Sequence, residues 1–264
     1  MRGERPVRRG KARISWAWSL VGIALLLALW EAGHRAYGPL VLPGLGDTAL
    51  TLWRMIRAGQ VGPALLETAG NAGLGWIIGV LIGSCAGMLA GLREEAQRAL
   101  QPVAIILLGV PAIAWVVMAL LWFGGRWAVV VTVAAATGPM LFAAALEGVR
   151  SLDGTLARMA RVYQVPLSAR LTEVYGPQLL SHLFPALVTT LAMSWKVAVM
   201  AELLAGAGGI GDGLATARAH VDTAETMAWV VVVVGVLIVV DAGVLQPLQR
   251  RLWLWRDDER SGGR

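Results

Sequence analysis

The stretch AGNAGLGWIIGVLIGSCAGMLAG, residues 69–91, contains no charged side chain. It is longer than the roughly 20 apolar residues that a helix needs to cross a bilayer. Its glycines recur at every fourth position and therefore share one helix face, which lets a neighbouring backbone approach closely. We predict a transmembrane helix that packs through this glycine ridge, and we favour packing within one subunit over a sliding or subunit interface. The ridge consists of Gly75, Gly79, Gly83, Gly87 and Gly91.

The rest of the chain has a similar composition. Of its 264 residues 57% are hydrophobic and 15% charged, and the mean hydropathy is +0.64. A soluble domain carries roughly 25% charged residues. A soluble enzyme and a disordered chain are therefore excluded, and the single Cys85 excludes a disulfide framework. We predict an all-α integral membrane protein with six transmembrane helices, at residues 16–33, 69–91, 100–123, 127–146, 183–205 and 229–246.

The basic residues predict the orientation of these spans. The net charge is +6, and 17 of the 23 lysines and arginines fall on the side of the N-terminus, against five on the other side. Basic residues collect on the cytoplasmic side of membrane proteins, so both termini are expected there, and the charge gives no reason to expect nucleic acid as a partner. The first span lacks a small-residue cleavage site, which favours an anchor over a signal peptide.

The spans divide the chain into five parts. We expect a basic cytoplasmic N-terminus at 1–15, a first transmembrane helix at 16–33, and an outer segment with a short surface helix at 34–63. A five-helix transmembrane domain at 64–246 and a cytoplasmic tail at 247–264 follow.

The longest inner segment, residues 147–182, carries an amphipathic helix. Leu156, Met159, Ala160 and Tyr163 fall at i, i+3, i+4 and i+7 and form one apolar face. Pro166 breaks this run, and a second short face is expected to end at residues 176–177. Such a helix packs either on its own membrane domain or in the groove of a partner, and the residue pattern leaves both open.

The stretch RMARVYQVPLSARLTEVYGP, residues 158–177, resembles the EAA loop of binding-protein-dependent ATP-binding cassette importer permeases. The spacing of that loop is kept, although its Glu and its Gly are absent. We call residues 155–177 the EAA-like loop. Arg158, Met159 and Ala160 stand at Glu-Ala-Ala, Gln164 at the Gly, and Gly176 and Pro177 at Leu-Pro, while Ala160, Arg161 and Pro177 match the pattern.

Four further stretches resemble the nitrate/sulfonate/taurine branch of this family: VPAIAWVVMALLWFG (110–124), EGVRSLD (147–153), SWKVAVMAELLAGAGGIGDGL (194–214) and LQRRLWLWR (248–256). The resemblance implies a type I importer permease fold in the bacterial inner membrane, with a homodimer lining the path. It also implies a cytoplasmic ABC ATPase dimer that binds ATP and an outer solute-binding protein, while this chain contacts membrane lipid and binds no cofactor. Met159, Ala160 and Tyr163 would enter the ATPase groove, with Arg158 and Arg161 at its rim.

The substrate that the resemblance implies is a small solute, such as nitrate, a sulfonate or taurine. A thiamine-precursor pyrimidine is the alternative. Lys196 and Glu202 are the candidate residues of the translocation path, since ionisable side chains within spans are costly in lipid. Lys196 would attract an anion or fill a structural role. Glu202 precedes a glycine-rich break, so we interpret it first as architectural and second as a gate.

Other functions fit the sequence less well. An ATPase in this chain would need a phosphate-binding loop, and neither Lys11 nor Lys196 has that context. His34, His182 and His220 are widely spaced, so neither a metal site nor a membrane enzyme is expected. An ATP-independent secondary carrier remains the main alternative, although acidic relays and inverted repeats are not evident. A purely structural subunit is the third possibility.

Overall fold

The computed structural model describes residues 10–245, which contain helices and no strand. Most of the predicted basic N-terminus and the whole tail at 247–264 lie outside the described residues. The elements in chain order are α1 (Gly10–Tyr37), α2 (Leu45–Arg57), α3 (Val61–Leu92), α4 (Glu94–Gly109), α5 (Ala112–Trp122), α6 (Gly125–Arg150), α7 (Gly154–Val162), α8 (Leu167–Ala169), the π-helical η1 (Arg170–Tyr175), α9 (Gly176–Ala205), α10 (Gly209–Ala219), α11 (Thr223–Val240) and the π-helical η2 (Asp241–Leu245).

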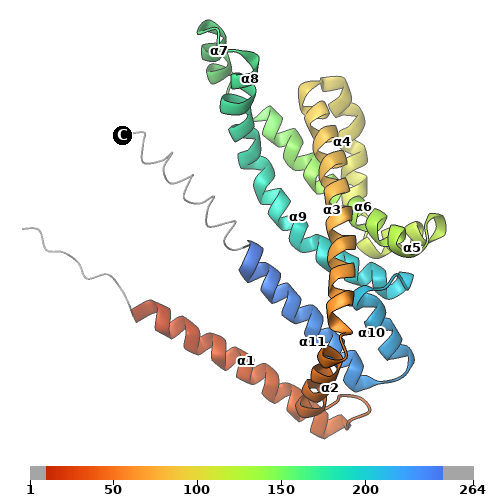
Figure 1. Cartoon of the computed structure of the whole chain (residues 1–264). Helices are drawn as coiled ribbons and strands as arrows, with labels where there is room; N and C mark the ends of the chain where they lie inside the picture. The colour runs from red at the N-terminus through yellow and green to blue at the C-terminus, as the bar shows by residue number, and fades with distance from the viewer. Residues whose placement is uncertain (1–9, 246–264) are drawn as a thin grey trace, which may run out of the picture.

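Three long helices, α3, α6 and α9, pack on one another and form the centre of the molecule (Figure 1). α10 turns back from the end of α9 and packs against α9, α3 and α11. The main hydrophobic core joins these helices, and its largest buried side chains include Val133, Trp195, Ile210 and Trp229. The sequence forms this bundle because the long apolar runs bury one face each against their neighbours.

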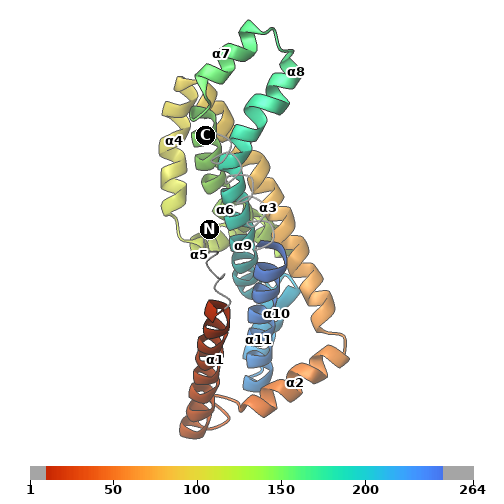
Figure 2. The same cartoon turned by 90° about the vertical axis from the view of Figure 1, so that its left-hand side faces the viewer.

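The two ends of the bundle carry different elements. α7 and α8 extend beyond α6 and α9 at one end, here called the loop end, while α2 lies across the opposite end, here called the α2 end (Figure 2). α2 packs on α11, buries Thr48 and Met55, and lies within the outer segment 34–63, for which the sequence predicts a short surface helix.

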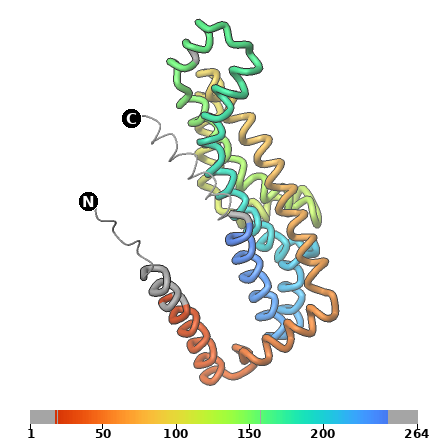
Figure 3. Tube along the Cα trace, turned by 60° about the vertical axis from the view of Figure 1, so that its left-hand side comes forward, coloured from red at the N-terminus to blue at the C-terminus, as the bar shows by residue number. Residues whose placement is uncertain are grey.

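The first helix, α1, contains the expected first span and diverges from the rest of the bundle (Figure 3). The C-terminal part of α1 and the turn that follows it are held by two hydrogen bonds. Trp30 donates from Nε1 to the carbonyl of Pro43 at 2.9 Å, and Thr223 donates from Oγ1 to the carbonyl of Pro39 at 3.1 Å. Apolar side chains in the middle of α1, such as Leu25 and Leu29, are exposed within this chain.

Within the described residues, four helical segments are long and apolar enough to cross a membrane, and a bent helix pair makes a fifth. The four are α3, α6, the continuous segment Leu167–Ala205 and the segment Thr223–Gly243. They cover the expected second, fourth, fifth and sixth spans, apart from residues 244–246 at the end of the sixth, of which residue 246 lies outside the described part. The count of six remains a prediction.

The third expected span, residues 100–123, is not one helix. It consists of α4 and α5, which meet at an angle of 101° around Val110 and Pro111. Both residues have extended backbone, with ψ of 123° and 142°. Pro111 has no N–H for a helical hydrogen bond, and its ring disfavours the helical conformation of the residue before it. We call this break the α4–α5 elbow.

Candidate functional site

The glycine ridge of α3 lies against α6 of the same chain. An added Cβ at Gly75 would stand 2.6 Å from Cβ of Val133, and one at Gly91 would stand 2.6 Å from Cβ of Val149. At Gly83 the new atom would meet the backbone of Gly138. Gly79 and Gly87 are equally close to α6, so the five glycines together bring two helix backbones into contact within one subunit.

At the loop end, α7 begins with a side-chain cap. The Asp153 carboxylate accepts the backbone N–H of Thr155 at 2.7 Å, and this hydrogen bond holds the pKa of Asp153 below its ordinary value. The backbone N–H of Asp153 donates to the side-chain oxygen of Gln178 at 2.9 Å. The cap therefore fixes the start of α7 and ties it to the first turn of α9.

The predicted apolar face of α7 divides into an exposed part and a buried part. Met159 is 54% exposed and Tyr163 80% exposed, and Leu156 and Val162 are exposed as well. Ala160 is only 7% exposed, because α7 packs against η1 on that side. The methyl group of Ala160 is thus covered within this chain, which differs from the groove contact that the resemblance implies. Arg158 donates from Nε to the carbonyl of Gly154. Arg161 also interacts with another group of this chain.

Gln164 ends α7 in the left-handed conformation, with φ of +51°. The N–H of Gln164 donates to the carbonyl of Arg161 at 3.1 Å, and the N–H of Val165 donates to the carbonyl of Ala160 at 3.0 Å. This is a Schellman motif, whose left-handed position is usually occupied by glycine. Gln164 stands at the position of the Gly in the EAA loop and keeps the left-handed turn that a glycine would favour. Its side chain makes this backbone conformation strained.

The second short face does not end at Gly176 and Pro177, as the sequence suggested. The chain continues as one helical segment from α8 through η1 into α9. The wider π-helical turn at Arg170–Tyr175 comes directly before Pro177, which lies in the first turn of α9. Pro177 has no N–H to donate to a carbonyl of the preceding turn, so the helical hydrogen-bond pattern is interrupted where η1 passes into α9.

At the α2 end, Glu202 is fully buried and joins three helices. Its carboxylate accepts Thr68 Oγ1–H at 2.7 Å and Asn71 Nδ2–H at 3.0 Å, both from α3. It also accepts the backbone N–H of Gly211 at 3.3 Å, while Thr68 Oγ1 accepts the N–H of Ile210 at 2.9 Å. We call these residues the Glu202 cluster. These hydrogen bonds link α3, α9 and the N-terminus of α10. The dipole of α10 favours negative charge at its N-terminus, where the Glu202 carboxylate lies.

The glycine-rich break after α9 allows this cluster to form. Gly208 and Gly209 have positive φ angles of 76° and 84°. A Cβ at Gly209 would lie 2.5 Å from the Glu202 carboxylate. Glu202 and the glycines could be identified from the sequence pattern, whereas Thr68 and Asn71 were not predicted. Asn71, an amide within an apolar span, was the available signal, because such a group needs a buried partner.

Lys196 lies on α9 between the buried residues Trp195 and Val197, and its own side chain is exposed in this chain. It forms no ion pair with any residue in the described range 10–245. Glu202 belongs to a separate cluster, so the structure does not bring the two candidate path residues together. Residues 10–245 also contain no group of three His, Cys, Asp or Glu that could hold a metal ion.

Comparison with known proteins agrees with this architecture. Residues 79–251 match the family described as binding-protein-dependent transport system inner membrane component. The chain is 26% identical to the candidate aliphatic sulfonates transport permease SsuC of Bacillus subtilis, over 94% of this chain and 91% of that protein. It is 26% identical to the taurine transport system permease TauC of Escherichia coli, over 93% and 95%.

A chain of the MetNI methionine ABC transporter, solved in inward-facing conformations, has the same fold. It superimposes with a TM-score of 0.58 and 16% identity, over 72% of this chain and 93% of that one. The family match covers well over half of this chain and includes α6, α9 and the EAA-like loop. The chain is therefore a multi-pass membrane protein that belongs to the family of inner membrane components of binding-protein-dependent transport systems.

Proposed function

We propose that this chain is the permease subunit of an ATP-binding cassette importer, and that it works as a homodimer. Both termini and the loop end face the cytoplasm, where a separate ATPase dimer binds ATP. A solute-binding protein delivers the substrate at the α2 end. The observation that carries this proposal is the exposed apolar face of α7 on a chain of this family.

The exposed face supports docking because a soluble surface rarely keeps large apolar side chains together without a partner. Met159 on α7 and Tyr163, the residue that caps its C-terminus, lie one turn apart and are both more than half exposed. Both residues lie outside the candidate membrane spans. A helix that presents such anchors fits a hydrophobic groove, here on the ATPase. Motion received by α7 reaches α6 through Ser151 and α9 through Gln178.

Met159→Glu tests the docking proposal. Burying a Met side chain contributes about 1.5–3 kcal/mol, so its replacement by a charge should weaken ATPase association at least about tenfold. Ser168→Glu is the matched control, because it adds the same charge to an exposed site of the same loop outside α7. Association would be measured by co-purification from membranes at equal permease yield. Equal ATPase recovery with both variants would contradict the docking role of α7.

For the substrate we propose a small organic anion of the sulfonate class. The two curated relatives described above carry aliphatic sulfonates and taurine in their names. Lys196 supports the proposal, because an ammonium group in a span is costly in lipid and needs water, protein or an anion beside it. Its exposed position on α9 fits the path between two copies of the chain. For Glu202 we propose a structural role at the α2 end, which its buried hydrogen bonds to Thr68 and Asn71 support.

Lys196→Met tests this assignment in vesicles that hold the complete transporter. We expect sulfonate uptake to fall at least about tenfold at unchanged assembly, since a lost charge-assisted contact is worth about 1.5–3 kcal/mol. Lys196→Arg, which keeps the charge, should retain most of the uptake. If the Met variant transports like the parent, Lys196 has no role in moving the anion.

A further inference from the structure

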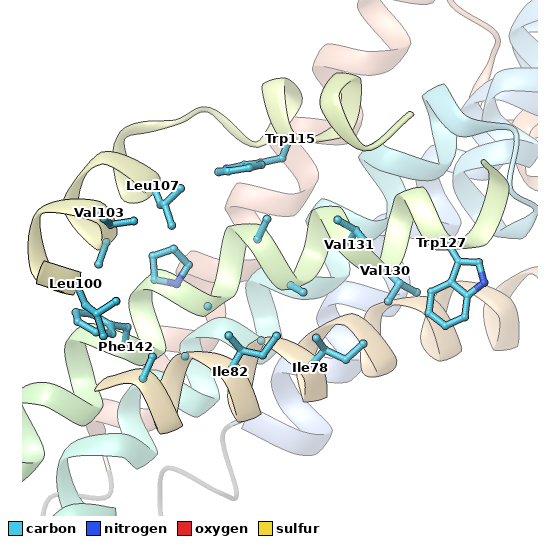
Figure 4. A pocket seen from close by; sticks show the side chains of 18 residues that line it. Ile78, Ile82, Leu100, Val103, Leu107, Trp115, Trp127, Val130, Val131 and Phe142 are labelled. Atoms are coloured by element: carbon cyan, nitrogen blue, oxygen red, sulfur yellow. The ribbon is translucent and has the colours of Figure 1, made fainter. Parts of the chain in front are cut away.

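A cavity of about 400 Å³ lies between α3 and α6 on one side and α4 and α5 on the other (Figure 4). Its lining extends along α6 from Trp127 to Phe142, a distance of about 22 Å at 1.5 Å per residue. The cavity is therefore long and lies parallel to a membrane-spanning helix, directly behind the α4–α5 elbow.

The lining of this cavity is hydrocarbon almost throughout. It includes Ile78, Ile82, Leu100, Val103 and Leu107, and it contains no hydroxyl, amide or charged side chain. Its polar side-chain groups are the indole N–H groups of two tryptophans. Water in a cavity needs two to four polar partners, so an aqueous filling is disfavoured. The occupant that this chemistry fits is apolar.

The cavity opens at the outer surface of the chain. Three of its lining side chains are also exposed there: Ile82 at 66%, Val103 at 49% and Trp127 at 57%. These residues belong to α3, α4 and α6, at the level of the hydrocarbon layer that α3 and α6 cross. The molecules that surround the opening in a membrane are therefore lipid acyl chains.

The size of the cavity distinguishes an acyl chain from a helix of a second copy. A cavity of about 150 Å³ takes benzene, or about 25 Å³ per carbon, so about 400 Å³ holds roughly 16 carbons. A helix with side chains is about 10 Å wide, and four turns along the same 22 Å would need roughly 1,700 Å³. The cavity is about four times too small for a helix.

We propose that this cavity is a lipid site that takes one acyl chain of a membrane phospholipid. The chain inserts from the side, between α3 and α4, and lies along α6 behind the elbow. There it packs against Leu107 of α4, near the elbow, and Val131 of α6. It thus fills the space between α4 and α6 behind the 101° bend that joins α4 to α5.

The test uses the full-length protein in vesicles that contain a phospholipid with a photoactivatable diazirine in the middle of its palmitoyl chain. After irradiation, labelled peptides are mapped by mass spectrometry. We expect labelling of residues 78–86 and 100–107 to exceed that of the exposed apolar residues 20–29 on α1. Equal labelling of all three segments would overturn the proposal, since it is the pattern of general contact with lipid.

A filling variant provides the second measurement. Ala135 lines the cavity, and Ala135→Phe adds a benzene ring, about 150 Å³ on the same scale. Labelling of the lining should then fall at least about fivefold, with α1 labelled as before. Ala143→Phe is the matched control, because Ala143 is exposed on α6 and does not line the cavity. Unchanged labelling in Ala135→Phe would also overturn the proposal.

A third measurement distinguishes a lipid from a second copy of this chain as the occupant of the cavity. It uses crosslinking from an exposed position and needs no substitution in the protein core. A photoreactive benzoylphenylalanine at exposed position 82 should yield a lipid adduct of the single chain. A covalent chain-to-chain adduct at that position would assign the cavity to a second copy instead. Neither result depends on transport activity or on the presence of the ATPase.

Discussion

Gly75→Ala offers the sharpest test of the packing between α3 and α6. The new methyl carbon would stand 2.6 Å from Cβ and 2.9 Å from Cγ1 of Val133, and 2.7 Å from the carbonyl oxygen of Val130. These carbon contacts are about 0.5–0.8 Å shorter than ordinary van der Waals contact, which starts at 3.4 Å. Val133 is fully buried and β-branched, so it has no other rotamer to adopt.

The expected magnitude combines two opposing effects. Overpacking of this kind destabilises by about 1–3 kcal/mol, and replacing glycine by alanine within a helix returns about 0.5–1 kcal/mol. The net loss for Gly75→Ala is then about 1–2 kcal/mol. Gly73→Ala, two residues away on α3, meets nothing within 4 Å and should gain about 0.5–1 kcal/mol.

The two variants would be compared by thermal melting of the purified protein, followed through its loss of a monodisperse elution peak. A difference of about 2 kcal/mol between them corresponds to roughly 4–8 °C in Tm for a chain of this size. Adding Val133→Ala to Gly75→Ala removes the Cγ1 contact but leaves the other two, so only part of the loss should be recovered. If both single variants raise Tm equally, the close approach of α3 and α6 is refuted.

Three further predictions concern the Glu202 cluster and the EAA-like loop. Glu202→Gln places an amide N–H donor beside groups that already donate, such as Thr68, and should lower stability by about 1–3 kcal/mol in the same melting assay. An unchanged Tm would refute the stabilising role of the Glu202 cluster. Gln164→Gly removes the side chain from a residue with left-handed backbone and should stabilise the end of α7 by about 1 kcal/mol. The expected result is slower hydrogen exchange of the Val165 amide, and faster exchange would contradict it. The pKa of Asp153 lies below its ordinary value of 3.8, so its cap is fully present above pH 3.8 and is lost as pH falls through the lowered value. Amide protection of α7 should therefore drop as pH falls below 3.8 in the parent but not in Asp153→Asn.

Much of the fold could be predicted because the chain alternates long apolar runs with basic segments. The central helices α3, α6 and α9 include the expected spans, with ends displaced by up to about eight residues where the helix continues beyond the apolar run. The α4–α5 elbow was not predicted because hydropathy averaged over a window is insensitive to a break in the helical backbone. Pro111, which favours such a break, is visible in the sequence.

The candidate site was harder to predict because its contacts join distant segments. Thr68 lies 134 residues from Glu202 in the chain, and no periodicity connects the two. The burial of Ala160 likewise depends on η1, which folds back against α7 after the helix has ended. A helical pattern identifies an apolar face, but only tertiary packing decides which part of that face a neighbour covers.

The α4–α5 elbow also bears on how this protein enters the membrane during synthesis. At 1.5 Å per residue α4 is about 24 Å long and α5 about 16 Å, so each is shorter than the roughly 30 Å hydrocarbon layer. α4 in addition begins with Glu94 and Glu95. Neither helix would partition into lipid as an independent unit. We therefore expect their insertion to depend on α3 and α6, which come immediately before and after them in the chain, and to be complete only after α6 has been synthesised.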